Sequence, residues 1–418
     1  MFRKDWRSDV MLQAIKQLMP KDQGPLVCGV IIVWVSSLLY LLFSGGKLAF
    51  ILFVIITMIS TYQLLLAKCS GIHTITGDRI SKLPKRLEAG DFYHIKTTFR
   101  IPGFWPILYV LIKERLTHHK FGTQIYESSF VPNFYRCGDI AYSIPNLKRG
   151  SYTFEETECS TGDLLNLFEH KSSLQLPLSF NVYPRTVHID NWPYVSSFRK
   201  AIRQTSASKY QKETIEMDGI RDYVHGDRLS IIHWNASAKT GDLKAKEFIR
   251  ESVPNILILI DQYYASYHDE EQFELAVSTA ASIIRYIRNH QIPVGLFLPG
   301  KQIRFYEPRP GVTYSHRLEE HLLHVDKNGE IPIEEVLLNQ KLKQLQGSLV
   351  IVITPEASDS LFQRLQGLKK IQLHPCHIFL SSKDMPETEL WENQLKKERI
   401  RYYPVRSLEA LPAVLGGD

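Results

Sequence analysis

The stretch Gly219–Phe248, GIRDYVHGDRLSIIHWNASAKTGDLKAKEF, combines charge, glycine, tryptophan and small polar residues at a density found nowhere else in the chain. It leads into a continuous apolar segment, Ile256–Ile260, which is typical of a strand buried on both faces of a sheet. That strand ends on Asp261. Because ligands collect at the carboxyl ends of strands in open parallel sheets, Asp261 is a candidate site residue.

Downstream of this junction, apolar strands alternate with helical segments. The segment Glu271–His290, for example, places its apolar residues on one side of a helix. Such alternation predicts a parallel sheet that helices cover on both faces. Residues 255–418 are therefore predicted to form a doubly wound α/β domain, with strands at 256–260, 294–298, 349–354, 371–380 and 401–405 and helices at 271–290, 319–325, 333–346, 360–368 and 387–398.

Upstream, the hydrophobic pattern has the period of strands. His94–Ile101 alternates roughly by two, and turn residues such as Gly90–Asp91 and Pro102–Gly103 separate it from its neighbours. Short strands at this spacing predict an all-β antiparallel sandwich over residues 72–190. Its strands are expected at 94–101, 106–114, 121–130, 139–144, 150–158 and 178–183.

Residues 191–254 are interpreted as a connection that ends in the Gly219–Phe248 stretch. The polar run 184–212 interleaves Ser with Arg and Lys around Asn191-Trp-Pro193. It is therefore expected to travel along the surface, with a short helix at Val195–Arg203.

The N-terminal part contains two apolar runs, Leu26–Phe43 and Leu48–Ala67, joined by four residues. Each run has the length of about 20 residues that a bilayer crossing requires. Residues 25–68 are therefore predicted to form a transmembrane helical hairpin. Basic residues flank both ends, in the segment 1–24 and after the second run, so the positive-inside rule predicts a cell-membrane protein with both termini in the cytoplasm.

The composition excludes several classes of protein. A net charge of +6 over 418 residues, with Lys and Arg scattered among Asp and Glu, does not predict nucleic-acid binding. Five cysteines, far apart and odd in number, indicate a reducing compartment and no disulfide framework. Neither a Walker-type phosphate loop nor GxGxxG is present, so no nucleotide cofactor is predicted.

Asp261 has the position of a metal ligand but lacks the neighbours that a hard cation needs. Hydroxyls would be expected two and four residues later, where this chain has Tyr263 and Ala265. The position is therefore interpreted as a degenerate metal site, and no metal is predicted.

The Gly219–Phe248 stretch resembles the signature of the domain-of-unknown-function 58 family. Ile232 and Ala238 carry this resemblance together with eight of the candidate interaction residues, and the ninth candidate is the adjacent basic residue Arg228. These candidates are Arg221, Tyr223, Gly226, Asp227, Arg228, Trp234, Ser237, Lys239 and Glu247. The segments Arg149–Tyr152, Asp163–Phe168 and Val182–Pro184 resemble the β-rich lead-in of the same family.

The resemblance implies a C-terminal domain that is similar to von Willebrand factor A domains. It also implies partnership with an AAA+ ATPase of the MoxR type and sometimes with a transglutaminase-like membrane protein. Such domains carry a serine pair in an intact metal-ion-dependent adhesion site, and this chain has Tyr263 and Ala265 at those places, so the resemblance does not extend to metal-bridged binding.

Three functional hypotheses follow. The first is a non-enzymatic, membrane-anchored adaptor for a MoxR-type ATPase that remodels client proteins. The second is a hydrolase that uses Asp227, Ser237, Lys239 and Asp261, and the third is a divalent-cation-dependent binding domain. Within the signature, a purely structural network of Arg221, Asp227 and Glu247 is an alternative to a docking surface.

Overall fold

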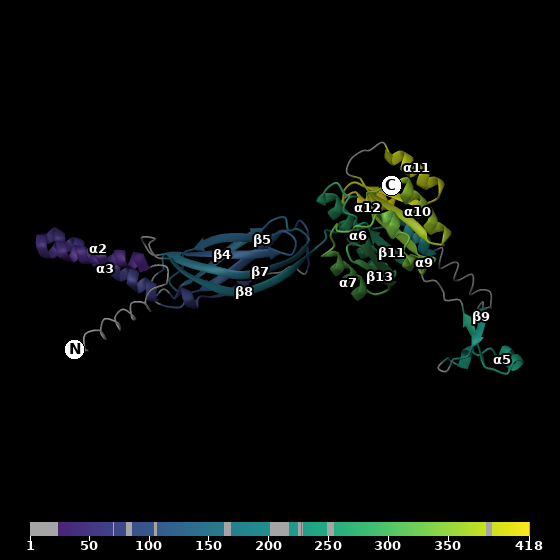
Figure 1. The fold of residues 1–418 in the computed structure, drawn as a ribbon, viewed down its shortest axis with the longest axis horizontal. Coiled ribbons are helices and arrows are strands. Elements are labelled where there is room, and N and C mark those ends of the chain that lie inside the picture. The colour runs from purple at the N-terminus through teal and green to yellow at the C-terminus, as the bar shows by residue number, and fades with distance from the viewer. Residues whose placement is uncertain are drawn as a thin grey trace, which may run out of the picture. The chain divides into compact units, whose positions relative to one another are not determined.

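The computed structural model describes residues 24–69, 71–80, 86–103, 107–162, 169–200, 217–224, 227, 229–248, 255–381 and 387–417. The chain divides into two compact units, Met1–Val182 and Tyr183–Asp418. Figure 1 shows the elements of both units along the chain, from the N-terminal helices to the C-terminal α/β region.

The first unit begins with two helices, α2 (Gly24–Ser44) and α3 (Gly46–Cys69), which pack against each other. Gly45 and Gly46 turn the chain between them with positive φ angles of 59° and 89°, which favour glycine. The Trp34 indole Nε1 donates a hydrogen bond of 3.1 Å to Thr57 Oγ1 across the pair. Large apolar side chains such as Ile32, Phe43 and Leu48 lie on the outside of the helices.

The prediction of a transmembrane hairpin is wrong. The predicted fold class and membrane localisation, which depend on that hairpin, are wrong with it. A crossing requires about 20 consecutive apolar residues in one helix. Across the described part of the chain, no helix combines the length and apolarity needed to cross a membrane.

The remainder of the first unit is a pair of antiparallel sheets that follow a short 3₁₀ helix, η1 (Ile72–Thr74). One sheet has the order β1 (Thr76–Ile80), β3 (Tyr93–Arg100), β6 (Cys137–Ile144). The other has the order β2 (Leu87–Glu88), β8 (Glu169–Tyr183), β7 (Gly150–Gly162), β4 (Val110–His118), β5 (Gly122–Phe130). Buried side chains alternate along β3 and β4, and their apolar members, such as Phe99 and Ile112, form the core with those of the other strands.

The second unit contains a six-stranded sheet with the order β13-β12-β11-β14-β15-β16. The ranges are β11 (Ile256–Ile260), β12 (Val294–Pro299), β13 (Ile303–Arg309), β14 (Leu349–Thr354), β15 (His374–Leu380) and β16 (Arg401–Val405). All neighbouring pairs are parallel except β12–β13, so β13 is an antiparallel edge strand. The strand predicted at 256–260 is confirmed residue for residue.

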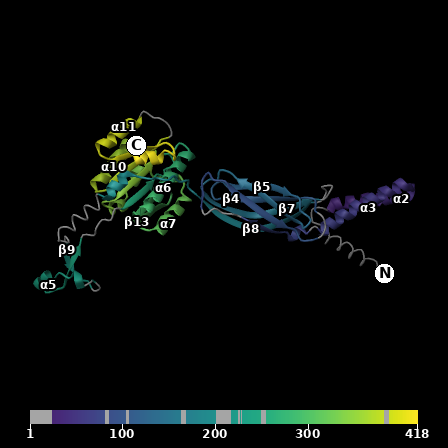
Figure 2. The same ribbon diagram turned by 180° about the vertical axis from the view of Figure 1, so that it is seen from behind.

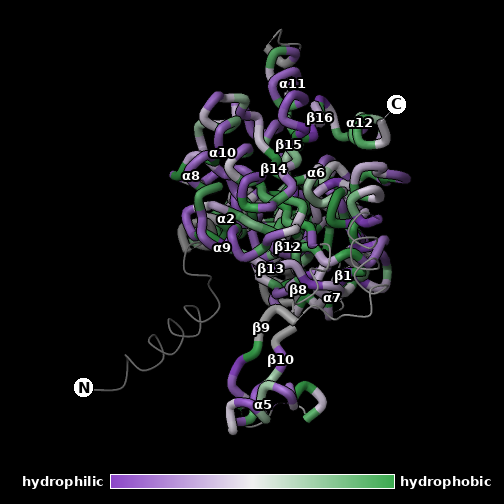
Figure 3. The backbone as a smooth tube through the Cα atoms, turned by 90° about the vertical axis from the view of Figure 1, so that its right-hand side faces the viewer, coloured by the Kyte–Doolittle hydropathy of each residue, from purple (hydrophilic) through white to green (hydrophobic). Residues whose placement is uncertain are grey.

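Helices cover both faces of this sheet (Figures 1 and 2). On one face, α6 (Glu270–Asn289), α7 (Val312–Leu322) and α12 (Leu411–Gly416) pack on Ile256, Ile258 and Ile260. On the other face, α8 (Ile333–Val336), α9 (Gln340–Lys343), α10 (Asp359–Lys370) and α11 (Glu387–Lys397) pack on Leu257 and Leu259. The central strands are accordingly hydrophobic along their length, as Figure 3 shows in green.

Residues 187–198 belong to the core of this unit. Trp192 has no exposed surface, and Val195 and Phe198 are buried in the same cluster as β11 and α6. The Tyr286 hydroxyl accepts a hydrogen bond from Trp192 N at 3.1 Å, and Trp192 Nε1 donates to the Tyr403 hydroxyl at 3.2 Å. The interpretation of this run as a surface connection is therefore wrong for these residues, although a helix does occupy residues 193–200.

Residues 217–248 form a small substructure, called the signature arm below. Its elements are β9 (Met217–Asp222), the 3₁₀ turn η2 (Leu229–Ile231), α5 (Trp234–Thr240) and β10 (Lys244–Phe248). The two strands pair with each other as a two-stranded antiparallel sheet. Ile232 and Ala245, which are both buried, face each other across an isolated bridge and form its small core.

Candidate functional site

Asp227 is the organising group of the signature arm. The Arg221 guanidinium donates two hydrogen bonds to its carboxylate, at 2.7 and 2.9 Å, and Val224 N donates a third at 3.1 Å. The Tyr223 hydroxyl donates to the Asp227 main-chain oxygen at 3.1 Å. The hydrogen bonds from Arg221, first, and from Val224 lower the pKa of Asp227 below its ordinary value. The carboxylate is thus ionised and occupied in holding the turn after β9.

Ser237 is buried on α5, and its hydroxyl makes two main-chain hydrogen bonds. Ser237 Oγ donates to His233 O at 3.1 Å and accepts from Lys244 N at 2.8 Å. The His233 ring does not face it as a base, since its Nδ1 caps the helix by accepting from Ala236 N at 3.0 Å. A nucleophilic serine needs a base within hydrogen-bond reach, and this arrangement uses the hydroxyl to tie α5 to β10 instead.

The other signature residues fall into two groups. Trp234 and Lys239 lie on α5 with exposed side chains, and Trp234 is 66% exposed. Gly226, Arg228 and the side chain of Glu247 lie outside the described residues. The predicted Arg221–Asp227 contact is therefore present, whereas the Glu247 part of that network stays a prediction.

Large apolar side chains are exposed on the same arm. They are called the arm patch and comprise Ile220, Val224, Leu229, Trp234 and Leu243, each between 47 and 70% exposed. Five large exposed apolar side chains within one small substructure favour an interaction surface, since single scattered exposures are what an ordinary protein surface shows.

Asp261 lies fully buried at the carboxyl end of β11. Its carboxylate accepts hydrogen bonds from Tyr263 N at 2.9 Å and from Thr354 Oγ1 at 2.8 Å. Burial raises the pKa of Asp261 to about 6, although hydrogen bonds from Tyr263, Thr354 and Ser266 oppose that rise. In the part of the chain that the structure describes, no group of three His, Cys, Asp or Glu side chains is placed to hold a metal ion.

Ser266 and Glu356 lie near Asp261, and Glu334 lies near Glu356. The Ser266 hydroxyl faces the carboxyl groups of both Asp261 and Glu356, and its side chain is 8% exposed. Burial raises the pKa of Glu356, and the neighbouring Glu334 adds to that rise. Glu334 accepts hydrogen bonds from Ser358 Oγ at 2.9 Å and Ser360 Oγ at 2.8 Å.

The loop after β11 is held by a second segment. Gly329 N donates to Gln262 O at 2.7 Å, and Tyr264 N donates to Gly329 O at 3.2 Å. A Cβ on Gly329 would meet Pro299 O at 2.6 Å and Gln262 O at 2.9 Å, so only glycine allows this close approach. The result is a fixed position for Tyr263 and Tyr264 beside the carboxyl groups.

Residues 219–366 match the model of the protein of unknown function DUF58. The match begins at the first residue of the signature arm's Gly219–Phe248 stretch and ends within α10. The chain is also 25% identical over 292 residues to the uncharacterized protein YeaD of Bacillus subtilis (strain 168). The aligned region covers 68% of this chain and 70% of YeaD. The resemblance to the DUF58 family is thus confirmed over this region.

Solved structures give only weak similarity. The CARDB domain of the PF1109 protein from Pyrococcus furiosus aligns with 26% of this chain and 91% of its own at 8% identity, with a TM-score of 0.17. The fimbrial subunit AggA from Escherichia coli aligns with 26% of this chain and 95% of its own at 10% identity, with a TM-score of 0.19.

Sequence reasoning missed Ser266, Glu334, Thr354 and Glu356, although the DUF58 match spans all four. A signal for two of them was present, because Thr354-Pro-Glu356 directly follows the predicted strand 349–354. In open α/β sheets, ligands bind at the carboxyl end of the strand from which the chain continues to both sides. β11 is such a strand, because β12 lies on one side of it and β14 on the other. Ser266 directly follows Ala265, the second position at which the sequence analysis expected a hydroxyl.

Two buried histidines, His118 and His377, are occupied by structural contacts. His118 Nε2 donates to Arg149 O at 3.1 Å, while its Nδ1 accepts from Lys120 N at 3.0 Å. Burial lowers the pKa of His118 to about 4. His377 accepts from Trp391 Nε1 at 3.1 Å, and burial lowers its pKa to about 3. Both rings are therefore neutral members of packed cores.

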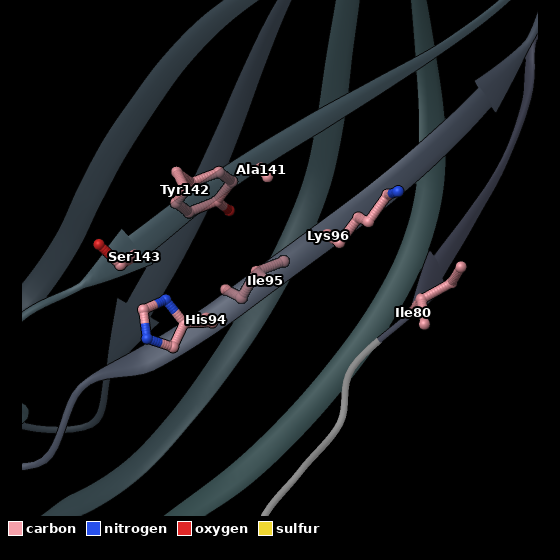
Figure 4. A pocket seen from close by; sticks show the side chains of 7 residues that line it. All are labelled: Ile80, His94, Ile95, Lys96, Ala141, Tyr142 and Ser143. Atoms are coloured by element: carbon pink, nitrogen blue, oxygen red, sulfur yellow. The ribbon is translucent and has the colours of Figure 1, made fainter.

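A pocket of about 420 Å³ lies on the first unit beside β3 and β6. Figure 4 shows its lining side chains, with His94, Ile95 and Lys96 from β3, Ala141, Tyr142 and Ser143 from β6, and Ile80 at the end of β1. The Tyr142 hydroxyl is bound to the buried carboxylate of Glu114, and Lys96 pairs with Asp139 at 2.8 Å. These polar groups are thus engaged in the sandwich itself.

Proposed function

We propose that this chain is a non-enzymatic interaction protein that docks a protein partner on the signature arm. The observation that supports this proposal is that the arm binds its polar groups internally and exposes its large apolar side chains. Its polar groups, such as Asp227 and Ser237, are bound internally, while the large side chains of the arm patch face outward. A two-stranded sheet is marginally stable by itself in water, so a partner that covers the patch also stabilises the arm.

The partner that we propose is an AAA+ ATPase of the MoxR type, as the DUF58 resemblance implies. We further propose that the second unit is a degenerate von Willebrand A-like domain. Its support is the doubly wound strand order, in which β12 and β14 lie on opposite sides of β11. Asp261 then occupies the strand end at which such a domain presents its ligand-binding groups.

The test is recovery of the MoxR-type ATPase of the same organism by the tagged full-length chain, with ATP, ADP or no nucleotide. Replacing Trp234 and Leu229 by Ala removes the two most exposed large side chains of the arm patch. Loss of two interface anchors typically weakens binding by about 2 kcal/mol or more, so at least a tenfold lower recovery is expected.

The matched control is Leu390→Ala, since Leu390 is 70% exposed on α11 and lies outside the arm. Its recovery is expected to equal that of the unmodified chain. The proposal fails if no nucleotide state yields the ATPase, or if the W234A/L229A chain recovers as much of it as the L390A chain does.

A further inference from the structure

The interior of the first unit holds a polar network to which both of its antiparallel sheets contribute. The Glu114 carboxylate on β4 is 1% exposed and forms a salt bridge with the Arg79 guanidinium on β1. The Tyr142 hydroxyl on β6 donates to the same carboxylate, and so does Thr157 Oγ1 on β7 at 3.4 Å. Tyr142 packs against both apolar clusters of this unit. The network therefore lies between those clusters, away from solvent.

One nitrogen of Arg79 is left over in this network. Its Nη1 donates to Leu176 O at 2.7 Å, and its Nη2 donates to Glu114 Oε1. The side chain is 5% exposed, and its Nε is buried without a hydrogen-bond partner among the described residues. The guanidinium stays protonated in proteins, so Nε–H is always a donor. Arg79 therefore keeps one buried donor that needs an acceptor.

Thr97 on β3 carries a second unpaired group. It has no exposed surface, and its Oγ1 has no partner in the part of the chain that the structure describes. Thr97 stands directly opposite Arg79 in the antiparallel pairing of β1 with β3. Opposite residues in such a pair point to the same face of the sheet, with Cβ atoms about 4.5–5.5 Å apart. The two unpaired groups therefore lie at adjacent positions on the inner face.

A common partner accounts for both groups. Buried polar groups in native proteins are nearly always hydrogen-bonded, because an unpaired one loses its hydration without compensation. Arg79 Nε and Thr97 Oγ1 are not bonded to each other, so the partner lies between them and reaches both. It must accept a hydrogen bond from Nε–H, whereas the Thr97 hydroxyl can either donate to it or accept from it.

The surroundings restrict this partner to a small neutral molecule. The charge of Arg79 is already balanced by Glu114, so an anion would add an unbalanced negative charge to the interior. A cation would be repelled by the guanidinium. The Phe154 ring covers one face of that guanidinium, with its centroid 4.0 Å from Cζ. Water meets these conditions, since it is neutral and buried waters typically make about two to four hydrogen bonds.

We propose that one buried water bridges Arg79 Nε and Thr97 Oγ1. The water accepts the hydrogen bond of Nε–H and donates one of its own to the Thr97 hydroxyl. It thereby holds the guanidinium in the orientation in which Nη2 reaches Glu114. It also links the salt bridge between the two sheets to the pairing of β1 with β3. The site belongs to the first unit and does not rest on docking at the signature arm.

The first test is a high-resolution crystal structure of the full-length chain. One water is expected at hydrogen-bond distance, about 2.5–3.2 Å, from both Arg79 Nε and Thr97 Oγ1. A direct bond between the two groups overturns the proposal. So does electron density that shows no water in contact with both.

Thr97→Val tests the site through stability, because the presence and the absence of the water predict opposite signs. Val has the shape of Thr without its hydroxyl. With the bridging water, T97V removes one of the bonds of the water and leaves Arg79 Nε poorly paired. The equilibrium constant for unfolding in urea, followed by circular dichroism, should then rise about tenfold. Without the water, T97V removes an unpaired buried hydroxyl, and the constant should fall. A constant that falls or stays unchanged overturns the proposal.

The matched control is Thr98→Val, at the next residue of β3. The Thr98 hydroxyl bonds to the exposed Asp139 on the outer face, and its removal should change the constant less than about threefold, as for most surface substitutions. If T97V does not fold, Thr97→Ser, which keeps the hydroxyl, is crystallised instead and should retain the water. Its absence from that variant also overturns the proposal. None of these results bears on recovery of the ATPase by the arm, so this inference and the proposed function fail independently.

Discussion

Replacing Asp261 by Asn is expected to change how the stability of the second unit depends on pH. Asp261 has no exposed surface, and burial raises its pKa from the ordinary 3.8 to about 6. The folded state therefore binds this proton more tightly than the unfolded chain. Raising the pH from 3.8 through 6 consequently lowers the free energy of unfolding, and the loss reaches about 3 kcal/mol above pH 7.

The amide that replaces the carboxyl group in D261N does not ionise, so the variant avoids that loss. About half of it, roughly 1.4 kcal/mol, falls between pH 5 and pH 8. The Asn side chain keeps one oxygen as an acceptor for Tyr263 N but offers an amino group to Thr354 Oγ1. This mismatch lowers the stability of D261N at every pH by about 1 kcal/mol and leaves its pH dependence unaffected.

The assay is urea unfolding of the full-length chain at pH 5 and pH 8, followed by tryptophan fluorescence. Trp192 and Trp391, both buried in the second unit, report on its transition. The unmodified chain should lose about 1.4 kcal/mol more than D261N between the two pH values. Asp359→Asn, at an exposed position on α10, is the control and should keep the original pH dependence. The same pH dependence in D261N and the unmodified chain would refute the argument.

Three other variants test the packing. Trp192→Ala should destabilise the second unit by about 3–5 kcal/mol in urea unfolding, since it removes a fully buried indole and its bond to Tyr403. Arg79→Met should destabilise the first unit by about 3–5 kcal/mol, because it leaves the buried Glu114 carboxylate without its ion pair, and adding Glu114→Leu should restore most of that loss. Gly241→Ala should weaken the arm by about 1 kcal/mol, measured as faster hydrogen exchange of α5 amides, because Gly241 ends that helix with φ of 82°.

The strands of the second unit could be predicted because burial on both faces leaves a simple pattern. Ile256–Ile260 and Leu349–Thr354 are continuous apolar runs, and both are strands with the predicted bounds. The edge strand β13 (Ile303–Arg309) was not predicted, since only one of its edges is paired and Pro308 interrupts the pattern. The predicted helix 333–346 is instead two short helices, because Asn339 caps a new start at Gln340.

Trp192 shows why composition failed as a guide to burial. Its neighbours Asp190, Asn191 and Pro193 are polar or turn-forming, so the run has no hydrophobic period. The single indole of Trp192 nevertheless holds this run in the core, because burying its large apolar surface is favourable even though its neighbours are polar. The hairpin prediction failed in a different way. The length and apolarity of the two runs predicted two crossings, but no helix in the described part of the chain is long and apolar enough for one.

The candidate site could be located only in part, because the sequence does not show which polar groups are already bound. The signature stretch offered the densest set of reactive side chains, yet Asp227 and Ser237 are occupied by Arg221, His233 and Lys244 in folding the arm. Groups that remain available lie elsewhere, at the end of β11. Glu356 and Tyr263 are partly accessible there. The candidate interaction surface is therefore better sought among side chains that stay exposed than among the densest polar ones, and this criterion favours the exposed apolar residues of the arm, on which we propose that a partner docks.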